Sequence, residues 1–384
     1  MAPGALVRVP LGRREVLGVA WAVRSADEDP GSEIELKPVT GVLDALPPLG
    51  DGWRDLVAFA ARYYQRSLGE IALAALPPQL RDLSAVQLER RLKRQAPPAA
   101  AAGGGEAAAA VVALTPEQTE ALARFEAEPG PFLLFGSTGS GKTEVYLRSV
   151  ATLLAREPAA QALVMVPEIN LTPQLEARFK ARFGADAVVS LHSGMTNPQR
   201  LASWLAAHGG AARIVLGTRM AVFASMPALR LIVVDEEHDP SYKQQEGARY
   251  SARDLAVWRG RREGAKVILG SATPSLESWH RSRPAEGEDA GGSYRRLAMP
   301  SRVGAGALPA VRLVDMNLQP PKTVLSGALL DAIGQRIARG EQSMVFLNRR
   351  GYAPVLACGD CGWKSECPHC SAYRVFHKID RTLR

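Results

Sequence analysis

The stretch PFLLFGSTGSGKTEVYLRSVATLLAR, residues 131–156, decides the fold of this 384-residue chain. It begins with an apolar run typical of a buried strand, continues through the octapeptide GSTGSGKT, and ends in a segment with helical periodicity. A strand, a glycine-rich loop and a helix in this order are the setting that a phosphate-binding loop requires. The whole octapeptide is therefore a predicted ATP site, made of Gly136, Ser137, Thr138, Gly139, Ser140, Gly141, Lys142 and Thr143.

Each residue type in this loop has a chemical reason to be there. Glycines allow backbone N–H groups to approach and wrap the phosphates at the start of the helix. We expect Lys142 to reach the β and γ oxygens of ATP, which makes it a catalytic candidate, and Thr143 to offer its hydroxyl to Mg²⁺.

A second strand supplies the acids that a nucleotide site needs. The run LRLIVVDEEHD, residues 229–239, is apolar until it ends in carboxylates, at the edge of the sheet where ligands bind. Asp235 is predicted to hold Mg²⁺ through water, and Glu236 to orient or deprotonate the attacking water. His238 is expected to be a structural or coupling residue rather than a catalyst.

The chain around these motifs alternates apolar strands with amphipathic helices up to about residue 280. This alternation predicts an α/β fold with a parallel sheet and crossover helices on both faces. The motif LTPEQ, residues 114–118, predicts the start of its first helix, with Thr115 as N-cap, Pro116 at the first position and Gln118 at the third position of a capping box. The preceding stretch, 96–110, is rich in Pro, Ala and Gly and is expected to be a linker.

The N-terminal part reads as a small β-rich module. Residues 6–12 and 15–23 are Val-rich runs that predict two short strands. In the helical segment 51–65, Leu56, Phe59, Ala60 and Tyr63 share one face, which predicts that all four side chains are buried.

Composition limits the class of protein and its partners. The chain carries 47 Lys and Arg against 39 Asp and Glu, a formal charge of +8 that favours an acidic polymer such as DNA or RNA as partner. It contains no apolar run long enough to span a membrane and no signal-peptide pattern after Met1. A cytoplasmic protein without membrane contact is the prediction.

Several motifs together resemble a known family. GSTGSGKT and DEEHD stand in order with three further segments of the superfamily 2 helicases, and other segments look like the bacterial primosomal replication-restart helicases within that superfamily. The superfamily segments are VPEINLTPQ (166–174), GTRMAVFA (217–224) and GSATPS (270–275). The narrower resemblance rests on SYKQQEGARYSARDLAV (241–257), FLNRRGYAP (346–354), CGDCGWKSECPHC (358–370), RVPLGRREVLGV (8–19) and ARYYQRSLGEIALAALP (61–77).

The resemblance implies an ATP-driven 3′-to-5′ DNA helicase that recognises stalled or collapsed replication forks and initiates primosome assembly. It implies as partners forked DNA, primosome proteins, the loader of the replicative helicase and the single-stranded DNA-binding protein. The alternative is another superfamily 2 repair or recombination translocase, or an ATP- and DNA-binding module without motor activity.

The family also implies roles for individual residues. Thr218 and Arg219 would contact the DNA backbone, Ser271 and Thr273 would couple hydrolysis to movement with His238, and a loop carrying Tyr242, Lys243, Arg249 and Tyr250 would link DNA contact to ATP turnover.

Two residue assignments remain open from the sequence. Gln118 either contacts the adenine, as the family implies, or only caps its helix. The loop from Tyr242 to Tyr250 suits base stacking, because aromatic and basic side chains alternate in it, but it is alternatively a buried connection between a strand and a helix.

The four cysteines predict zinc binding. Cys358, Cys361, Cys367 and Cys370 form two CxxC pairs in a chain expected to be cytoplasmic, where Zn²⁺ is favoured over disulfides. The five residues between the pairs are few for a single four-thiolate site. In the family the pairs are halves of two zinc sites, each completed by later cysteines. The resemblance therefore implies that each pair forms half a site here, unless His369 or His377 fills in as a ligand.

The predicted organisation places one complete RecA-like lobe between two smaller regions. The parts are an N-terminal 3′-end DNA-binding domain (1–94), a linker (95–112), helicase lobe 1 (113–298), a connector (299–324), the start of lobe 2 (325–357) and a partial zinc-binding region (358–384). Against the family pattern the chain looks shortened at both ends and lacks an evident winged helix. We therefore expect it to bind ATP but to hydrolyse it poorly and to unwind nothing, because the second lobe supplies an arginine to such sites.

Overall fold

The computed structural model divides into two compact units, Met1–Gly306 and Ala307–Arg384. The first unit contains the phosphate loop and the acidic segment 235–239, and the second contains the cysteines. Residues described by the structure are 1–22, 37–95, 113–167, 172–286, 291–304, 310–320, 323–346, 355–358, 361–368, 373–377 and 381–383.

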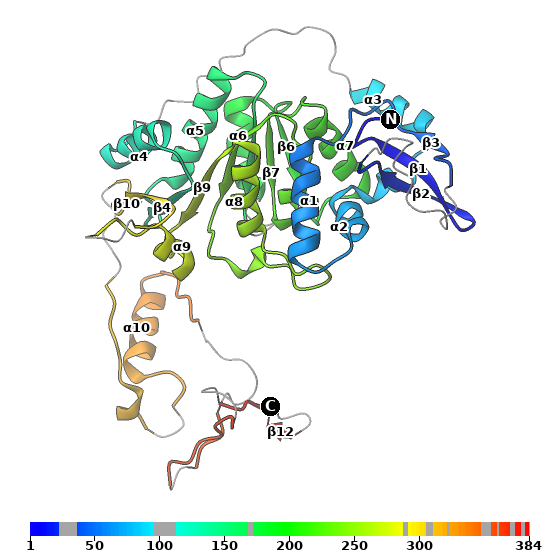
Figure 1. Cartoon of the computed structure of the whole chain (residues 1–384). Helices are drawn as coiled ribbons and strands as arrows, with labels where there is room; N and C mark the ends of the chain where they lie inside the picture. Colours follow the sequence, from blue (N-terminus) through cyan, green and yellow to red (C-terminus); the bar gives the residue numbers. More distant parts are fainter. Residues whose placement is uncertain are drawn as a thin grey trace. The chain divides into compact units, whose positions relative to one another are not determined.

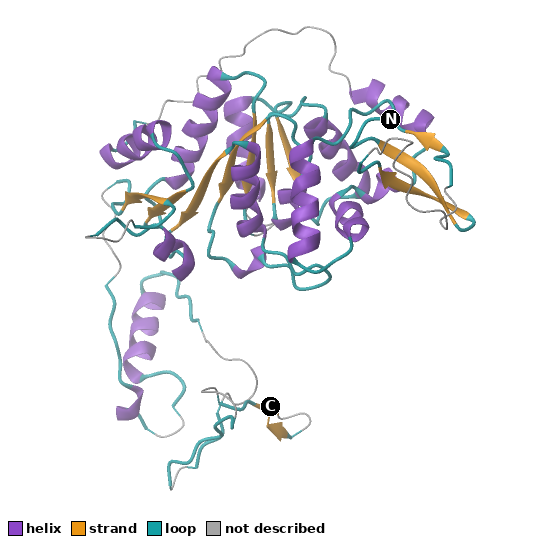
Figure 2. Ribbon diagram, in the orientation of Figure 1, coloured by secondary structure: helices purple, strands orange, loops and turns teal. Residues whose placement is uncertain are grey.

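A seven-stranded sheet organises the first unit, and every neighbouring pair of its strands is parallel (Figure 2). The order across the sheet is β10-β4-β9-β8-β5-β7-β6. This confirms the predicted parallel sheet. Its strands are β4 (Phe132–Gly136), β5 (Gln161–Met165), β6 (Val188–Leu191), β7 (Ile214–Gly217), β8 (Leu229–Val234), β9 (Lys266–Ser271) and β10 (Arg295–Met299).

Helices cover both faces of this sheet (Figure 1). Successive residues of β8 belong to different hydrophobic clusters, because Leu231 and Val233 join one and Ile232 and Val234 join the other. The first cluster is completed by α4 (Pro116–Ala127), α5 (Lys142–Arg156) and α6 (Thr172–Phe183). The second takes residues of α7 (Asn197–His208) and α8 (Ala252–Glu263), and the short helix α9 (Leu276–Arg281) follows β9.

The N-terminal part contains a small antiparallel sheet and three helices. The sheet order is β2-β1-β3, with β1 at Leu6–Leu11, β2 at Arg14–Val19 and β3 at Gly41–Val42. The predicted second strand, 15–23, is therefore too long, because Val19 already pairs with Leu6, the first residue of β1. The helices are α1 (Asp51–Tyr63), α2 (Leu68–Ala75) and α3 (Ala85–Gln95), with a 3-10 turn at Pro78–Arg81.

Helix α1 packs on the large sheet's helical layer. Leu56 and Ala60 are fully buried, as predicted, but Tyr63 is 66% exposed, so the prediction was wrong for that residue. The reason is the order of the rings: Phe59 stacks on Trp258 of α8 at 4.5 Å between centroids, and Tyr63 stacks on Phe59 at 5.4 Å. Tyr63 is thus the outermost ring of the row.

The N-terminal helices and the large sheet share one hydrophobic core. Residues from Leu43 to Leu88 belong to the same buried cluster as Leu163 and Val215 of the sheet. Trp53 of α1 donates a hydrogen bond from Nε1 to the Phe223 carbonyl at 2.8 Å, in the 3-10 turn Arg219–Phe223. The linker stretch 96–112 between these parts lies outside the described residues.

The second unit contains a 3-10 turn at Met316–Leu318, helix α10 (Gly327–Ala338) and a two-stranded antiparallel hairpin, β11 (Phe376–His377) with β12 (Thr382–Leu383). Ser326 is the N-cap of helix α10, and its side chain accepts from the Leu329 N–H. All but the first residue of the motif at 346–354 lies outside the described residues. Among the helices that the structure describes, none has the length and apolar character needed to cross a bilayer.

Candidate nucleotide-binding site

The phosphate loop connects the end of β4 to the start of α5, as predicted. Two of its residues, Gly139 and Gly141, have left-handed backbone with φ of 85° and 82°. A Cβ at Gly141 would also lie 2.2 Å from the Gln118 amide nitrogen. Both the conformation and the space therefore require glycine at 141.

Gln118 supports this loop from the neighbouring helix α4. Its Oε1 accepts from the Thr115 N–H at 2.9 Å while the Thr115 hydroxyl accepts from its N–H, which confirms the predicted capping box. Its Nε2 donates to the Ser140 carbonyl at 3.1 Å. The residue is 3% exposed, so it bridges the helix cap and the phosphate loop. Its contact with adenine stays a prediction.

The three catalytic candidates face one another. Lys142 Nζ donates to the Gly136 carbonyl at 3.0 Å and lies 3.9 Å from Glu236 Oε1. Asp235 extends the edge of β8, since its N–H donates to Met165 O at 2.9 Å. Glu236 has a positive φ of 45°, a conformation that a non-glycine residue rarely adopts and that marks a constrained site.

A pocket of about 410 Å³ opens beside these groups. It adds four residues that the sequence motifs did not indicate: Ala113, Glu144, Arg178 and Val303. Arg178 is an exposed cation on α6, and Val303 donates its N–H to Gly139 O at 2.9 Å from the segment that follows β10. The full lining is Ala113, Gln118, Thr138, Gly139, Gly141, Lys142, Thr143, Glu144, Arg178, Asp235, Glu236 and Val303.

Two buried tyrosines hold Asp235. Tyr146 donates from its hydroxyl to Asp235 Oδ1 at 2.9 Å, and Tyr242 donates to the Asp235 carbonyl at 2.7 Å. Burial raises the pKa of the Asp235 carboxyl above its usual value, and the Tyr146 hydrogen bond opposes this rise. Sequence reasoning missed Tyr146, although its place one turn after Lys142 on α5 sets it on the same face.

The predicted coupling residues meet. His238 Nδ1 lies 2.7 Å from Ser271 Oγ at the end of β9, and its Nε2 lies 3.4 Å from Thr273 Oγ1. The acidic segment and the GSATPS segment are therefore joined by side chains of both.

The 240–251 loop is only partly accessible. Lys243 and Arg249 are exposed and Tyr250 is half-buried, whereas Tyr242 is 2% exposed and turns inward to Asp235. Arg219 donates to Ser241 O at 2.6 Å and to Lys243 O at 3.3 Å, so the 217–224 motif holds this loop. The neighbouring Thr218 is 9% exposed.

The N-terminal part also contacts the 240–251 loop. The Tyr64 hydroxyl accepts from the Ser251 N–H at 3.0 Å, and Lys243 Nζ lies 5.3 Å from the centre of the Tyr64 ring. Arg66 donates to Gly247 O at 2.9 Å. The loop therefore lies between the N-terminal helices and the acids of the nucleotide pocket.

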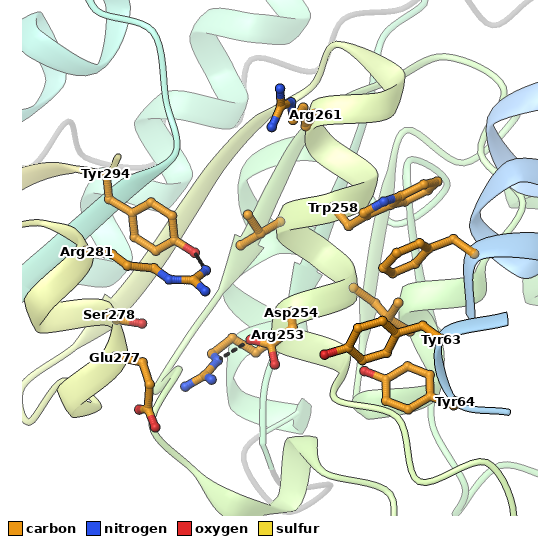
Figure 3. A pocket seen from close by; sticks show the side chains of 13 residues that line it. Tyr63, Tyr64, Arg253, Asp254, Trp258, Arg261, Glu277, Ser278, Arg281 and Tyr294 are labelled. Carbon is orange, nitrogen blue, oxygen red and sulfur yellow. Dashed lines mark hydrogen bonds and ion pairs between the residues drawn. The ribbon is translucent and has the colours of Figure 1, made fainter. Parts of the chain in front are cut away.

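A second pocket, of about 480 Å³, is lined by residues of α1, α8 and α9, by Tyr64 directly after α1 and by Tyr294 directly before β10 (Figure 3). Aromatic rings and arginines make up much of its wall, and Arg281 donates to the Tyr294 hydroxyl at 3.0 Å. Of the described residues, none lines both this pocket and the nucleotide pocket.

Two backbone hydrogen bonds join Cys358 to residues that follow it in the cysteine region. Cys358 O accepts from the Gly362 N–H at 3.1 Å and Cys358 N–H donates to Trp363 O at 2.8 Å. Within the described ranges no three His, Cys, Asp or Glu side chains gather closely enough to hold a metal. Cys370, His369 and the His377 side chain lie outside the described residues, so the zinc sites stay predictions.

Comparison with known proteins agrees with the two parts of the first unit. Residues 115–281 match the DEAD/DEAH box helicase family, and residues 1–77 match the 3′DNA-binding domain (3′BD). Replication restart protein PriA of Bacillus subtilis is 41% identical over 256 residues, which cover 66% of this chain and 31% of that protein. The protein of the same name from Haemophilus influenzae is 34% identical over an alignment of 447 residues, covering 99% of this chain and 60% of the relative.

A third relative, replication restart protein PriA of Rickettsia prowazekii, is 33% identical over 383 residues, 99% of this chain and 55% of that protein. The chain thus spans between 31% and 60% of the length of these three relatives. Both domain matches and the near-complete coverage of this chain point to one family: the chain belongs to the replication restart protein PriA family of superfamily 2 DEAD/DEAH helicases.

Proposed function

We propose that this chain carries the ATP-binding and DNA-binding machinery of a 3′-to-5′ DNA helicase that recognises stalled or collapsed replication forks and initiates primosome assembly. The observation that supports this most directly is the convergence of Lys142, Asp235 and Glu236 on one pocket beside the phosphate loop. The match of residues 1–77 to a 3′DNA-binding domain supports the DNA specificity.

ATP hydrolysis needs three tasks, and the pocket offers a residue for each. Lys142, now bonded to Gly136 O, is placed to exchange that carbonyl for phosphate oxygens, and exposed Arg178 adds positive charge to the pocket. Asp235 and Thr143 offer the oxygen ligands that Mg²⁺ prefers, and the bound ion would neutralise developing phosphate charge. Glu236 would take up the proton of the attacking water.

Single-stranded DNA is proposed to pass over the 217–224 and 240–251 segments. Lys243 and Arg249 are exposed cations, Tyr250 offers part of a ring for stacking, and Arg219 holds the loop that carries them. Thr218 and Arg219 would contact the DNA backbone. Tyr242 would act from beneath, through its hydrogen bond to Asp235 O, unless the loop opens to expose it.

The remaining assignments follow the family. We propose that the domains divide at 94, 112, 298, 324 and 357, and that the partners are primosome proteins, the helicase loader and the single-stranded DNA-binding protein. We also propose that Cys358, Cys361, Cys367 and Cys370 bind Zn²⁺, because clustered CxxC thiolates are typical zinc ligands. Atomic absorption can measure the zinc content of the parent chain and of Cys358→Ser. A parent chain without zinc, or a zinc content that Cys358→Ser leaves unchanged, would refute this proposal.

The decisive experiment combines nucleotide and DNA binding with hydrolysis. Lys142→Ala should weaken binding of Mg²⁺-ATP by about tenfold or more while forked-DNA affinity changes little, because the lysine touches only the nucleotide pocket. Lys180→Ala is the matched control, since Lys180 lies on α6 paired with Glu176. Nucleotide binding unaffected by Lys142→Ala would reject the proposed ATP site. Absence of forked-DNA binding by the parent chain would reject the fork-directed function.

A further inference from the structure

Glu237 is a buried carboxylate with no role in the motif reasoning. It stands between Glu236, which faces the nucleotide pocket, and His238, which contacts Ser271. Its side chain is 0% exposed, and its N–H donates to Gly270 O at 3.0 Å. A carboxylate placed so deeply is costly unless donors compensate for the lost water.

Four donors surround this carboxylate. The Ser275 N–H donates to Oε1 at 2.7 Å. Oε2 accepts from the Ser275 hydroxyl at 3.1 Å, the Ser278 hydroxyl at 2.8 Å and Arg253 Nη1 at 3.2 Å. Glu237 is thus fully engaged, and it fixes the positions of the groups that bond to it.

The donors belong to two helices, because Ser275 is the N-cap of α9, Ser278 lies within α9 and Arg253 belongs to α8. Ser275 also ends the GSATPS segment, and Arg253 lies in the first turn of α8. Helix α8 begins directly after the 240–251 loop, with Ser251 as its N-cap. Arg253 and Ser278 both reach the wall of the second pocket, where Figure 3 shows them with Asp254, the other ion-pair partner of Arg253.

Neighbouring residues of the acidic segment therefore contact different parts of the molecule. Glu236 Oε1 lies 3.9 Å from Lys142 Nζ, and one peptide unit further on Glu237 bonds to α8 and α9. A backbone movement of Glu236 toward a bound phosphate would also shift the Glu237 contacts, because one planar peptide joins the two residues.

We propose that Glu237 is a positioning residue that, with Arg253, links the nucleotide state of the acidic segment to the start of α8 and so to the 240–251 loop. The inference rests on the proposed function, since it assumes that this loop contacts DNA. Glu237 itself touches neither nucleotide nor DNA; it sets the relative position of the segments that do.

The test measures how nucleotide changes DNA affinity. Fluorescence anisotropy of labelled single-stranded DNA is recorded for the full chain with and without Mg²⁺ and the non-hydrolysable analogue AMP-PNP. For the parent chain we expect the two dissociation constants to differ by about fivefold, a usual size for such coupling. Glu237→Gln keeps the shape but removes the charge opposite Arg253 and replaces one acceptor oxygen with an NH2 donor, so the ratio should fall toward one.

A matched control separates coupling from general damage. Glu263→Gln changes another carboxylate that pairs with a buried arginine, Arg259, at 2.7 Å, but both residues lie in α8, so this pair does not join α8 to the acidic segment. It should keep the parent ratio. Ser278→Ala removes one donor from Glu237 with little risk to folding and should lower the ratio part of the way.

Each result has a clear meaning. An unchanged ratio in both Glu237→Gln and Ser278→Ala overturns the inference, and so does a parent chain that binds both ligands without any linkage. Loss of nucleotide and DNA binding together with a lowered melting temperature, in both variants, reduces Glu237 to a structural role and also overturns it. A parent chain that binds neither ligand contradicts the proposed function instead.

Discussion

Gln118 shows how one side chain can serve two purposes at the residue scale. The capping box that it forms with Thr115 is repeated at Thr196 and Gln199 on α7. Only Gln118 also donates to a phosphate-loop carbonyl, at Ser140. The chain therefore offers its own comparison between a capping glutamine and one that could do more.

Gln118→Ala should lower stability by about 1 kcal/mol through the lost cap and should also weaken nucleotide binding. If Gln118 supports only the phosphate loop, ATP and GTP should lose affinity equally. If it contacts adenine as well, ATP should lose more than GTP. Competition binding with both nucleotides measures the difference.

Gln199→Ala is the control for this prediction. It removes the equivalent cap on α7 and should reduce the melting temperature similarly, with nucleotide affinity unchanged, since Gln199 does not line the nucleotide pocket. Equal loss of nucleotide affinity in both variants would show that the effect is only a consequence of lower stability.

Asp235 illustrates the conflict between stability and function. Because burial raises the pKa of its carboxyl, the folded state binds a proton more tightly than the unfolded state, and the ionised group opposes folding at neutral pH. Asp235→Asn should therefore melt at a higher temperature than the parent chain without nucleotide. It should also bind Mg²⁺-nucleotide about tenfold or more weakly.

The pH dependence provides the check. The contribution of this group to stability improves as the pH falls toward the raised pKa, so the gap between Asp235→Asn and the parent chain should narrow in acid. Differential scanning fluorimetry from pH 8 to pH 5 follows both proteins. A variant that melts lower than the parent chain at pH 8 would contradict the argument.

The placement of site residues was predictable where the signal was local. Lys142, Asp235 and Glu236 lie in short motifs with defined spacing, and the structure brings them together. Tyr146 and Glu237 were missed because their contacts are with residues distant in sequence: Asp235 for the first, Arg253 and Ser278 for the second. No spacing rule in one segment reports such contacts.

At the scale of elements, the strands of the large sheet were the most predictable feature. Buried parallel strands are apolar along their whole length, so runs such as 131–135 and 229–234 stand out. The faces of amphipathic helices were less certain. Tyr63 has the correct spacing for the buried face of α1. How far that face is covered depends on Trp258 of α8, which stacks on Phe59, and the sequence of α1 gives no information about this contact.

The docking of α1 on the sheet layer leads to a prediction at this scale. Trp53→Phe keeps most of the apolar contact but leaves the Phe223 carbonyl without its Nε1 donor in a buried place. We expect a loss of about 1–3 kcal/mol in the free energy of unfolding, measured by urea denaturation. Trp279→Phe, at a tryptophan that is 40% exposed, should cost much less; equal losses would argue against the hydrogen bond.

At the scale of the whole first unit, His208 joins the N-terminal part to the large sheet. Its Nε2 lies 2.9 Å from Pro47 O and its Nδ1 lies 2.9 Å from Ser225 Oγ. The carbonyl can only accept, so the neutral ring carries its proton on Nε2 and accepts from the serine hydroxyl. Burial lowers the pKa of His208 below its usual value of 6.5, and the bond to Pro47 opposes that shift.

His208 should make the packing of the N-terminal part against the large sheet less stable in acid. A lowered pKa in the folded state means that the unfolded state binds the proton first, so the contribution of His208 is complete above pH 6.5 and is lost as the pH falls through the lowered value. His208→Gln retains a donor for Pro47 O but cannot titrate. It should melt at a lower temperature than the parent chain at pH 7.5, because the His208 ring also stacks on Trp204 at 4.8 Å. Its melting temperature should nevertheless depend less on pH between 7.5 and 5.

His280→Gln, at an exposed histidine on α9, is the control and should retain the pH dependence of the parent chain. If His208→Gln shows the parent slope as well, the acid sensitivity originates elsewhere, and His208 is only a packing and hydrogen-bonding residue between the N-terminal part and the sheet.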